Sequence, residues 1–202
     1  MFKMTVFYLR LFVTVAISIL PSFFCCCSPS TSTIRCDKVR AFIEAYNNHE
    51  LDNFLSFLSD DAQIFEIKDK NKIRKLTEWN FAVNSRINVT NLMYADEKVT
   101  FIAEIEDDFD KFLGIENRVY DPVVISFKDG LISQMKMTPR EDDRIKADKN
   151  MKSFIKWAGE KEPQKLAGLM ANRKLTFTKE NAKQWLDLLK MWHDSTSSRQ
   201  SI

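Results

Sequence analysis

The turn at Asp129-Gly130 constrains the fold more than any other feature, because it lies between two apolar segments. An Asp-Gly pair in that setting favours a β-hairpin with a tight turn. It predicts that residues 118–127 and 131–137 are antiparallel neighbours in one sheet. Upstream, residues 87–94 and 99–105 alternate apolar and polar side chains, which is typical of strands with one buried face. We therefore expect a four-stranded antiparallel region.

The segment before this region has helical periodicity. Two successive apolar stripes recur at intervals of three and four residues and predict a helical hairpin: Val39, Phe42, Ile43 and Tyr46, then Leu51, Phe54, Leu55 and Leu58. Residues 62–67 have the β-branched and aromatic character of a strand, and residues 71–84 again have helical spacing. The expected order is helix, helix, strand, helix and four strands, which is an α+β fold.

Composition limits the possible functions. The chain has 202 residues, of which 45% are hydrophobic, with only 4 glycines and 5 prolines, so it can form a compact core. The formal net charge is +2, which supplies no field to attract nucleic acid, and we expect no nucleic-acid partner. His49 and His193 have no metal-ligand spacing, and the acidic run from Glu104 to Asp110 lacks the pattern of a calcium loop. We expect no metal and no cofactor, and we interpret the acidic run as a solvated loop.

The first 27 residues are predicted to be a targeting segment. Lys3 and Arg10 precede an apolar stretch that ends near Cys25, Cys26 and Cys27. Three outcomes are open: a cleaved signal peptide, a lipid-modified cysteine, or an uncleaved membrane anchor. Each of these places the folded part outside the cytoplasm, in the periplasm or at the cell surface. A buried N-terminal helix is the competing interpretation of the segment. Residues 28–36 are expected to be a polar tether, and Cys36 is too isolated for a disulfide framework.

The C-terminal part carries helical stripes and no strand signal. Residues 141–193 predict three amphipathic helices, followed by a disordered tail over residues 194–202. These helices either cover the outer face of the sheet, which predicts a monomer, or sit at the mouth of the domain, which leaves that face open for a homodimer. The lysines at 149, 152 and 156 are compatible with a membrane surface, but such a face is also typical of any solvated helix.

Residues 37–138 resemble the nuclear transport factor 2 (NTF2-like) superfamily, which includes SnoaL-like cyclases and ketosteroid isomerases. The matching features are the stretch from Val39 to Asn47, Leu51-Asp52, the stretch from Phe57 to Ala62, and the hairpin from Ile125 to Ile132. Residues 154–157 and 180–186 are similar to the tail of uncharacterised bacterial members. The resemblance implies a cone, in which a curved antiparallel sheet wraps around helices, over residues 37–140.

The same resemblance implies positions for a catalytic site. The carboxylate base of ketosteroid isomerases corresponds to Glu66, whereas their two oxyanion donors correspond to Phe42 and approximately Val123, neither of which can donate a hydrogen bond. Loss of these donors argues against isomerisation of that type. Tyr46 is the alternative donor. Glu66 as a solvent-facing strand residue is the competing interpretation.

The aromatic residues predict either a pocket or a packed core. The candidate pocket residues are Phe42, Tyr46, Glu66, Trp79, Tyr94, Phe101 and Tyr120. We expect an exported, non-catalytic module, either free or membrane-tethered, that binds a small apolar ligand or a protein partner. The alternative is a small-molecule isomerase, cyclase or hydrolase that uses a pocket carboxylate.

Overall fold

The computed structural model describes residues 30–171 and 174–197. The predicted targeting segment, residues 1–27, lies outside this described part. The elements up to residue 140 are α1 (Thr31–Asn47), α2 (Leu51–Ser56), β1 (Leu58–Ile64), α3 (Lys70–Ala82), β2 (Arg86–Ala95), β3 (Lys98–Glu106), α4 (Asp108–Phe112), β4 (Arg118–Lys128) and β5 (Leu131–Pro139). They are followed by α5 (Glu141–Lys161), α6 (Pro163–Gly168), β6 (Met170–Ala171), β7 (Lys174–Leu175), a short 3-10 helix η1 (Lys179–Asn181) and α7 (Ala182–Ser197).

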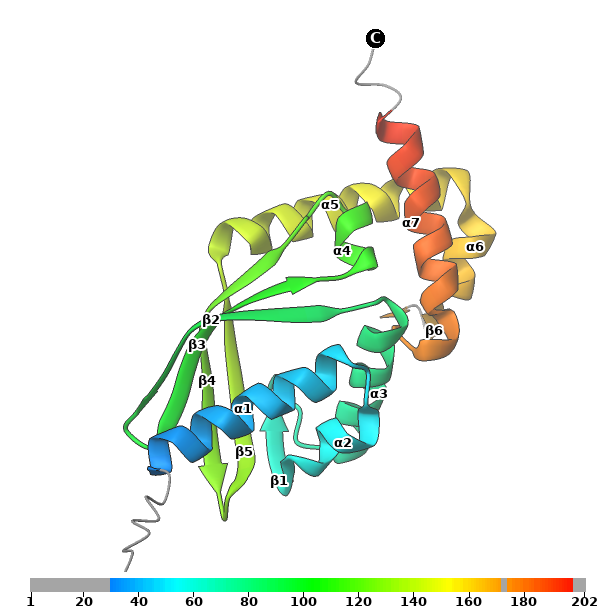
Figure 1. Ribbon diagram of the computed structural model, residues 1–202. Helices are drawn as coiled ribbons and strands as arrows, with labels where there is room; N and C mark the ends of the chain where they lie inside the picture. The colour runs from blue at the N-terminus through cyan, green and yellow to red at the C-terminus, as the bar shows by residue number, and fades with distance from the viewer. Residues whose placement is uncertain (1–29, 172–173, 198–202) are drawn as a thin grey trace, which may run out of the picture.

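One curved sheet carries the first part of the molecule. Its strand order is β1-β5-β4-β3-β2. The Asp129-Gly130 turn joins β4 to β5 as predicted, with both residues at positive φ, 50° and 79°. Strands β2 to β5 are antiparallel neighbours, whereas β1 joins the edge of β5 in the parallel sense. The helices α1, α2 and α3 lie against the inner side of the sheet (Figure 1).

Two hydrophobic cores hold the chain together. The first lies between the sheet and α1, and includes the predicted stripe residues Phe42, Ile43 and Tyr46. The second joins α5, α6 and α7 to the C-terminal end of α3 and to the segment around α4. Trp79 and Leu113 belong to this second core, so the C-terminal helices share their core with the sheet domain. The predicted α+β class, with a curved sheet wrapped on helices and a C-terminal helical extension, is confirmed.

The C-terminal helices gather at one end of the molecule, against α3 and α4 (Figure 1). The arrangement in which they cover the outer sheet face is therefore wrong. Their position leaves that face open, and the oligomeric state stays a prediction. Among the described helices, none is long and apolar enough to cross a membrane.

Several element boundaries differ from the sequence-based expectation. Helix α1 begins at Thr31, inside the expected tether, because the Ser30 side chain caps it by accepting a hydrogen bond from the Thr33 N–H. Helix α7 continues to Ser197, inside the expected disordered tail. The C-terminal part also contains the small hairpin β6–β7, which was not expected there. The acidic run contains helix α4, capped by Asp107, in place of the expected solvated loop.

The first testable prediction concerns the second core. Trp185 is fully buried and its Nε1 donates a hydrogen bond to the Thr176 carbonyl at 2.8 Å. Trp185→Ala should lower the free energy of unfolding by about 3–5 kcal/mol, because it removes a large buried ring and leaves a cavity. Lys190→Ala, at an exposed position of the same helix, should change it by less than about 0.5 kcal/mol. Urea unfolding measures both; equal effects of the two substitutions would contradict a shared core.

Candidate functional site

A cavity of about 270 Å³ lies at the inner side of the sheet. Its walls are mainly apolar and come from α1, α2, α3, the sheet and the segment around α4: Phe42, Phe54, Ile64, Phe65, Ile73, Leu76, Trp79, Ile87, Ile105, Phe109 and Met135. Its polar lining residues are Tyr46, Thr77, Asn80, Ser85, Asp107, Asp110, Arg118 and Tyr120. Apolar walls with a few converging polar groups are typical of small-molecule sites, although this volume is near the lower end of their range of about 300–1,000 Å³.

Helix α1 supplies the buried tyrosine of the cavity. The helical spacing that brings Phe42 against the core also turns Tyr46 inward, one turn later. The Tyr46 hydroxyl donates a hydrogen bond to Ser85 Oγ at 2.9 Å, and both residues are buried. Burial raises the pKa of Tyr46 above its ordinary value, while the neighbouring Ser85 and Asn80 oppose this shift. Tyr46 is therefore a neutral hydrogen-bonding group at any physiological pH.

A buried ion pair forms the second polar group. Asp110 on α4 pairs with the guanidinium of Arg118 at the start of β4. Only 6% of the Asp110 side chain is exposed, against 27% of the Arg118 side chain. The Arg118 Nε is buried and has no hydrogen-bond partner among the described residues. A buried donor without a partner costs free energy, so the Nε weakens the site unless other interactions of the guanidinium offset this cost.

Asp107 lies beside this pair and caps α4. Its Oδ1 accepts a hydrogen bond from the Asp110 N–H at 2.6 Å. Burial raises the pKa of Asp107 to about 6, and the negative charge of Asp110 adds to the shift, while Arg118 opposes it. Burial likewise raises the pKa of Asp110, against the charge and hydrogen bond of Arg118. Near neutral pH, Asp107 can therefore both accept and release a proton.

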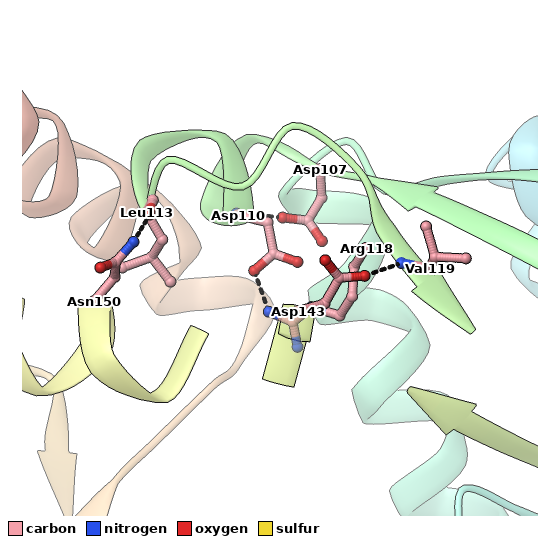
Figure 2. A network of polar contacts seen from close by, with 7 residues as sticks. All are labelled: Asp107, Asp110, Leu113, Arg118, Val119, Asp143 and Asn150. Atoms are coloured by element: carbon pink, nitrogen blue, oxygen red, sulfur yellow. Dashed lines mark hydrogen bonds and ion pairs between the residues drawn. The ribbon is translucent and has the colours of Figure 1, made fainter. Parts of the chain in front are cut away.

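Helix α5 contacts the backbone on both sides of this cluster through two side chains, as Figure 2 shows. Asp143 accepts a hydrogen bond from the Val119 N–H at 2.9 Å, immediately after Arg118. Asn150 donates a hydrogen bond to the Leu113 carbonyl at 2.7 Å, just after α4. The C-terminal extension thus fixes both backbone segments that carry the ion pair.

Tyr120 completes the polar part of the cavity. It lies two residues after Arg118 on β4, so both side chains point to the same face of the strand. Burial raises the pKa of Tyr120, and Arg118 opposes this shift. The cavity therefore combines two neutral phenols, one carboxyl group that titrates near neutral pH, and one guanidinium already paired with a carboxylate.

The structure brings together four of the seven predicted pocket residues. Phe42, Tyr46, Trp79 and Tyr120 all line the cavity. Phe101 is buried in the first core, and Tyr94 is half-buried at its edge; neither is among the lining residues.

Glu66 does not occupy the place expected of a base. Strand β1 ends at Ile64, and Phe65 and Glu66 form a tight turn with positive φ, 50° and 68°. Because the strand stops there, its alternation does not continue, and the Glu66 side chain is exposed in an outer groove. The carboxylates of the cavity are Asp107 and Asp110 instead. The signal that could have found them is the pair Phe109 and Phe112, which stand within and just after the acidic run at helical spacing and indicate that one face is buried.

Among the described residues, no three His, Cys, Asp or Glu side chains are grouped so that they could hold a metal ion. The expectation that the protein uses no cofactor stays a prediction.

Comparison with known proteins finds matches among solved structures alone. No protein-family model matches the chain, and no curated protein matches it. An NTF2-like protein of unknown function from Cytophaga hutchinsonii is 13% identical, with 58% of this chain and 99% of that chain covered and a TM-score of 0.45. An LEH-like epoxide hydrolase from M. tuberculosis is 16% identical, with 58% and 91% covered and a TM-score of 0.48. An uncharacterized cystatin fold protein from Novosphingobium aromaticivorans is 18% identical, with 51% and 96% covered and a TM-score of 0.44.

The second testable prediction is the titration of Asp107. Its carboxyl group should titrate near pH 6 in an NMR titration of the folded protein. Because its folded pKa is higher than its unfolded pKa, the stability that this group contributes is complete below about pH 4 and is lost as the pH rises through about 6. Asp107→Asn should remove this dependence and raise the free energy of unfolding at pH 8 by up to about 2 kcal/mol.

Asp108→Asn is the matched control for this experiment. Asp108 accepts a hydrogen bond from Asn84 Nδ2 at 2.6 Å and is not among the residues lining the cavity. Urea unfolding at pH 5 and pH 8 measures the dependence. A dependence that persists in the Asp107 variant, or disappears equally in the Asp108 variant, would assign it to other groups.

Proposed function

We propose that the protein binds a small, mostly apolar molecule that carries at least one oxygen atom, inside the cavity bounded by α1, α3 and the sheet. The observation that carries this proposal is the junction of apolar walls with a buried polar cluster in one cavity. The apolar walls favour the body of such a molecule through desolvation. The polar cluster favours an oxygen atom, because the phenol hydroxyls and the guanidinium among the lining residues can form hydrogen bonds with it.

The charge state of the cluster favours a neutral ligand. Asp110 already neutralises Arg118 through a direct ion pair. An anionic ligand would meet the buried carboxylates of Asp107 and Asp110, and the desolvation of a further charge in this site would be costly. A hydroxyl, carbonyl or ether oxygen on an otherwise apolar molecule avoids both costs.

The third testable prediction uses a matched pair of probes, 2-naphthol and naphthalene, which differ by one hydroxyl group. We expect 2-naphthol to bind more tightly, with shifts of the Tyr46, Trp79 and Arg118 resonances in NMR titrations. Tyr46→Phe should weaken 2-naphthol by about tenfold and leave naphthalene nearly unchanged, because it rearranges the polar end of the cavity and removes no apolar surface.

Tyr94→Phe is the control, since Tyr94 is a half-buried tyrosine that is not among the residues lining the cavity. Equal effects of the two substitutions, or binding that shifts only surface resonances, would contradict the proposed site.

A second function, small-molecule catalysis, is favoured by one specific observation. Asp107 has a pKa of about 6 beside two phenols and a guanidinium, which is the protonation range that general acid–base catalysis requires. In such a reaction Asp107 would transfer the proton, and Tyr46, Tyr120 and Arg118 would orient the substrate oxygen. Isomerisation, cyclisation and hydrolysis by water are reaction classes that these groups can serve.

The fourth testable prediction separates catalysis from binding. Small apolar epoxides, esters and unsaturated ketones that bind in the cavity are assayed for conversion across pH 4–9. If the site is catalytic, the rate should depend on a group with a pKa near 6, and Asp107→Asn should lower kcat by about a hundredfold or more, while Asp108→Asn should not. If compounds bind in the cavity but none of them is converted, the result would support the binding function alone.

A further inference from the structure

Two hollows meet at one pair of side chains. The cavity at the inner side of the sheet and a neighbouring groove of about 750 Å³ both have Phe65 and Met135 in their walls. The groove is otherwise lined by polar or long side chains from the end of β1 and from β5: Gln63, Glu66, Gln134, Lys136, Met137 and Thr138. Met135 is 4% exposed and Phe65 is half-buried, so the two hollows meet at a pair of largely covered side chains.

The backbone holds Phe65 in an unusual conformation. Ile64 and Ile67 exchange two hydrogen bonds, with N···O distances of 3.0 Å and 2.8 Å, around a two-residue turn. Both central residues, Phe65 and Glu66, have positive φ, a conformation that usually selects Asn, Asp or Gly. A large aromatic residue there is unfavourable for the turn itself, and such strained positions cluster at functional sites.

Contacts with the sheet keep the Phe65 turn in place. The Phe65 N–H donates a hydrogen bond to the Met135 carbonyl at 3.4 Å, which ties the turn to β5. Phe65 also packs against the first hydrophobic core. The turn is thus attached to the sheet by one long hydrogen bond and by the ring itself, and Phe65 lines both hollows.

We propose that Phe65, closing against Met135, is the barrier through which ligands enter the cavity from the outer groove, and that its size sets which molecules pass. This inference rests on the proposed function for its biological meaning. The barrier itself is a property of the fold and can be measured without a ligand. Glu66 and Lys136 carry opposite charges at the groove, so its entrance gives no preference for a charged molecule.

The test places a reactive thiol inside the cavity. Thr77 is buried and lines the cavity, and Thr77→Cys is close to isosteric. In the full chain with its native cysteines replaced by serine, the rate of reaction with a small neutral thiol reagent reports entry. Phe65→Ala should raise this rate by about tenfold or more, Phe65→Leu by less, and Phe65→Trp should lower it, because opening is governed by the packing of one ring.

Phe127→Ala is the matched control. Phe127 is also half-buried and packs against the first core, but it contacts Arg35 and lines neither hollow. Its substitution should leave the labelling rate within about twofold. If Phe65→Ala and Phe127→Ala raise the labelling rate equally, the whole fold has become looser and the barrier proposal is overturned. It is also overturned if no Phe65 variant changes the labelling rate. Phe65→Leu and Phe65→Trp keep the test decisive if Phe65→Ala fails to fold.

A second measurement links the barrier to ligand entry. Stopped-flow fluorescence of 2-naphthol binding should show that Phe65→Ala raises the association and dissociation rates together, by about tenfold, with a smaller change in Kd. If 2-naphthol binds the wild-type protein and its rates do not depend on Phe65, the proposed function stands and the entrance is elsewhere. If thiol labelling depends on Phe65 but no probe binds, the barrier stands and the proposed function fails.

Discussion

The ion pair between Asp110 and Arg118 organises the polar end of the cavity. Two charges leave most of their water when α4 packs against the start of β4, and such desolvation costs several kcal/mol per ion. The cost is offset only if both partners stay in contact, so the surrounding structure must hold α4 and β4 in a fixed relation. Asp107 does this from one side as the cap of α4, and α5 does it from the other through Asp143 and Asn150.

This requirement explains why the C-terminal helices belong to the same structural unit as the sheet. Without α5, the backbone N–H of Val119 and the carbonyl of Leu113 would lose their partners on that helix. The second core adds apolar packing to these hydrogen bonds, since Leu113 and Ile115 from the segment after α4 are buried against α5 and α7. The extension therefore acts on the site by positioning backbone, although no residue of α5, α6 or α7 is among those described as lining the cavity.

Local patterns predicted most elements, because helix periodicity and strand alternation depend on neighbouring residues. The stripe that includes Phe42 and Tyr46 placed both on the buried face of α1, and the Asp129-Gly130 turn paired β4 with β5. The carboxylates of the cavity were missed because their burial is not local. Asp110 meets Arg118 only when the chain between them folds back, and neither residue alone differs from a surface charge. Glu66 was misplaced because its strand ends at Ile64, three residues before the expected end, and the end of a strand is poorly marked in sequence.

Trp79 and Phe109 have two roles, since both line the cavity and both contact Trp185 of α7 in the aromatic cluster. A molecule in the cavity would contact the same two rings that pack against Trp185 of α7. Thermodynamic linkage then makes the effect reciprocal: if occupancy stabilises the docked position of α7, docking of α7 raises the affinity of the cavity by the same factor. Docking of α7 and binding in the cavity would then be coupled through Trp79 and Phe109, without direct contact between the helix and the bound molecule.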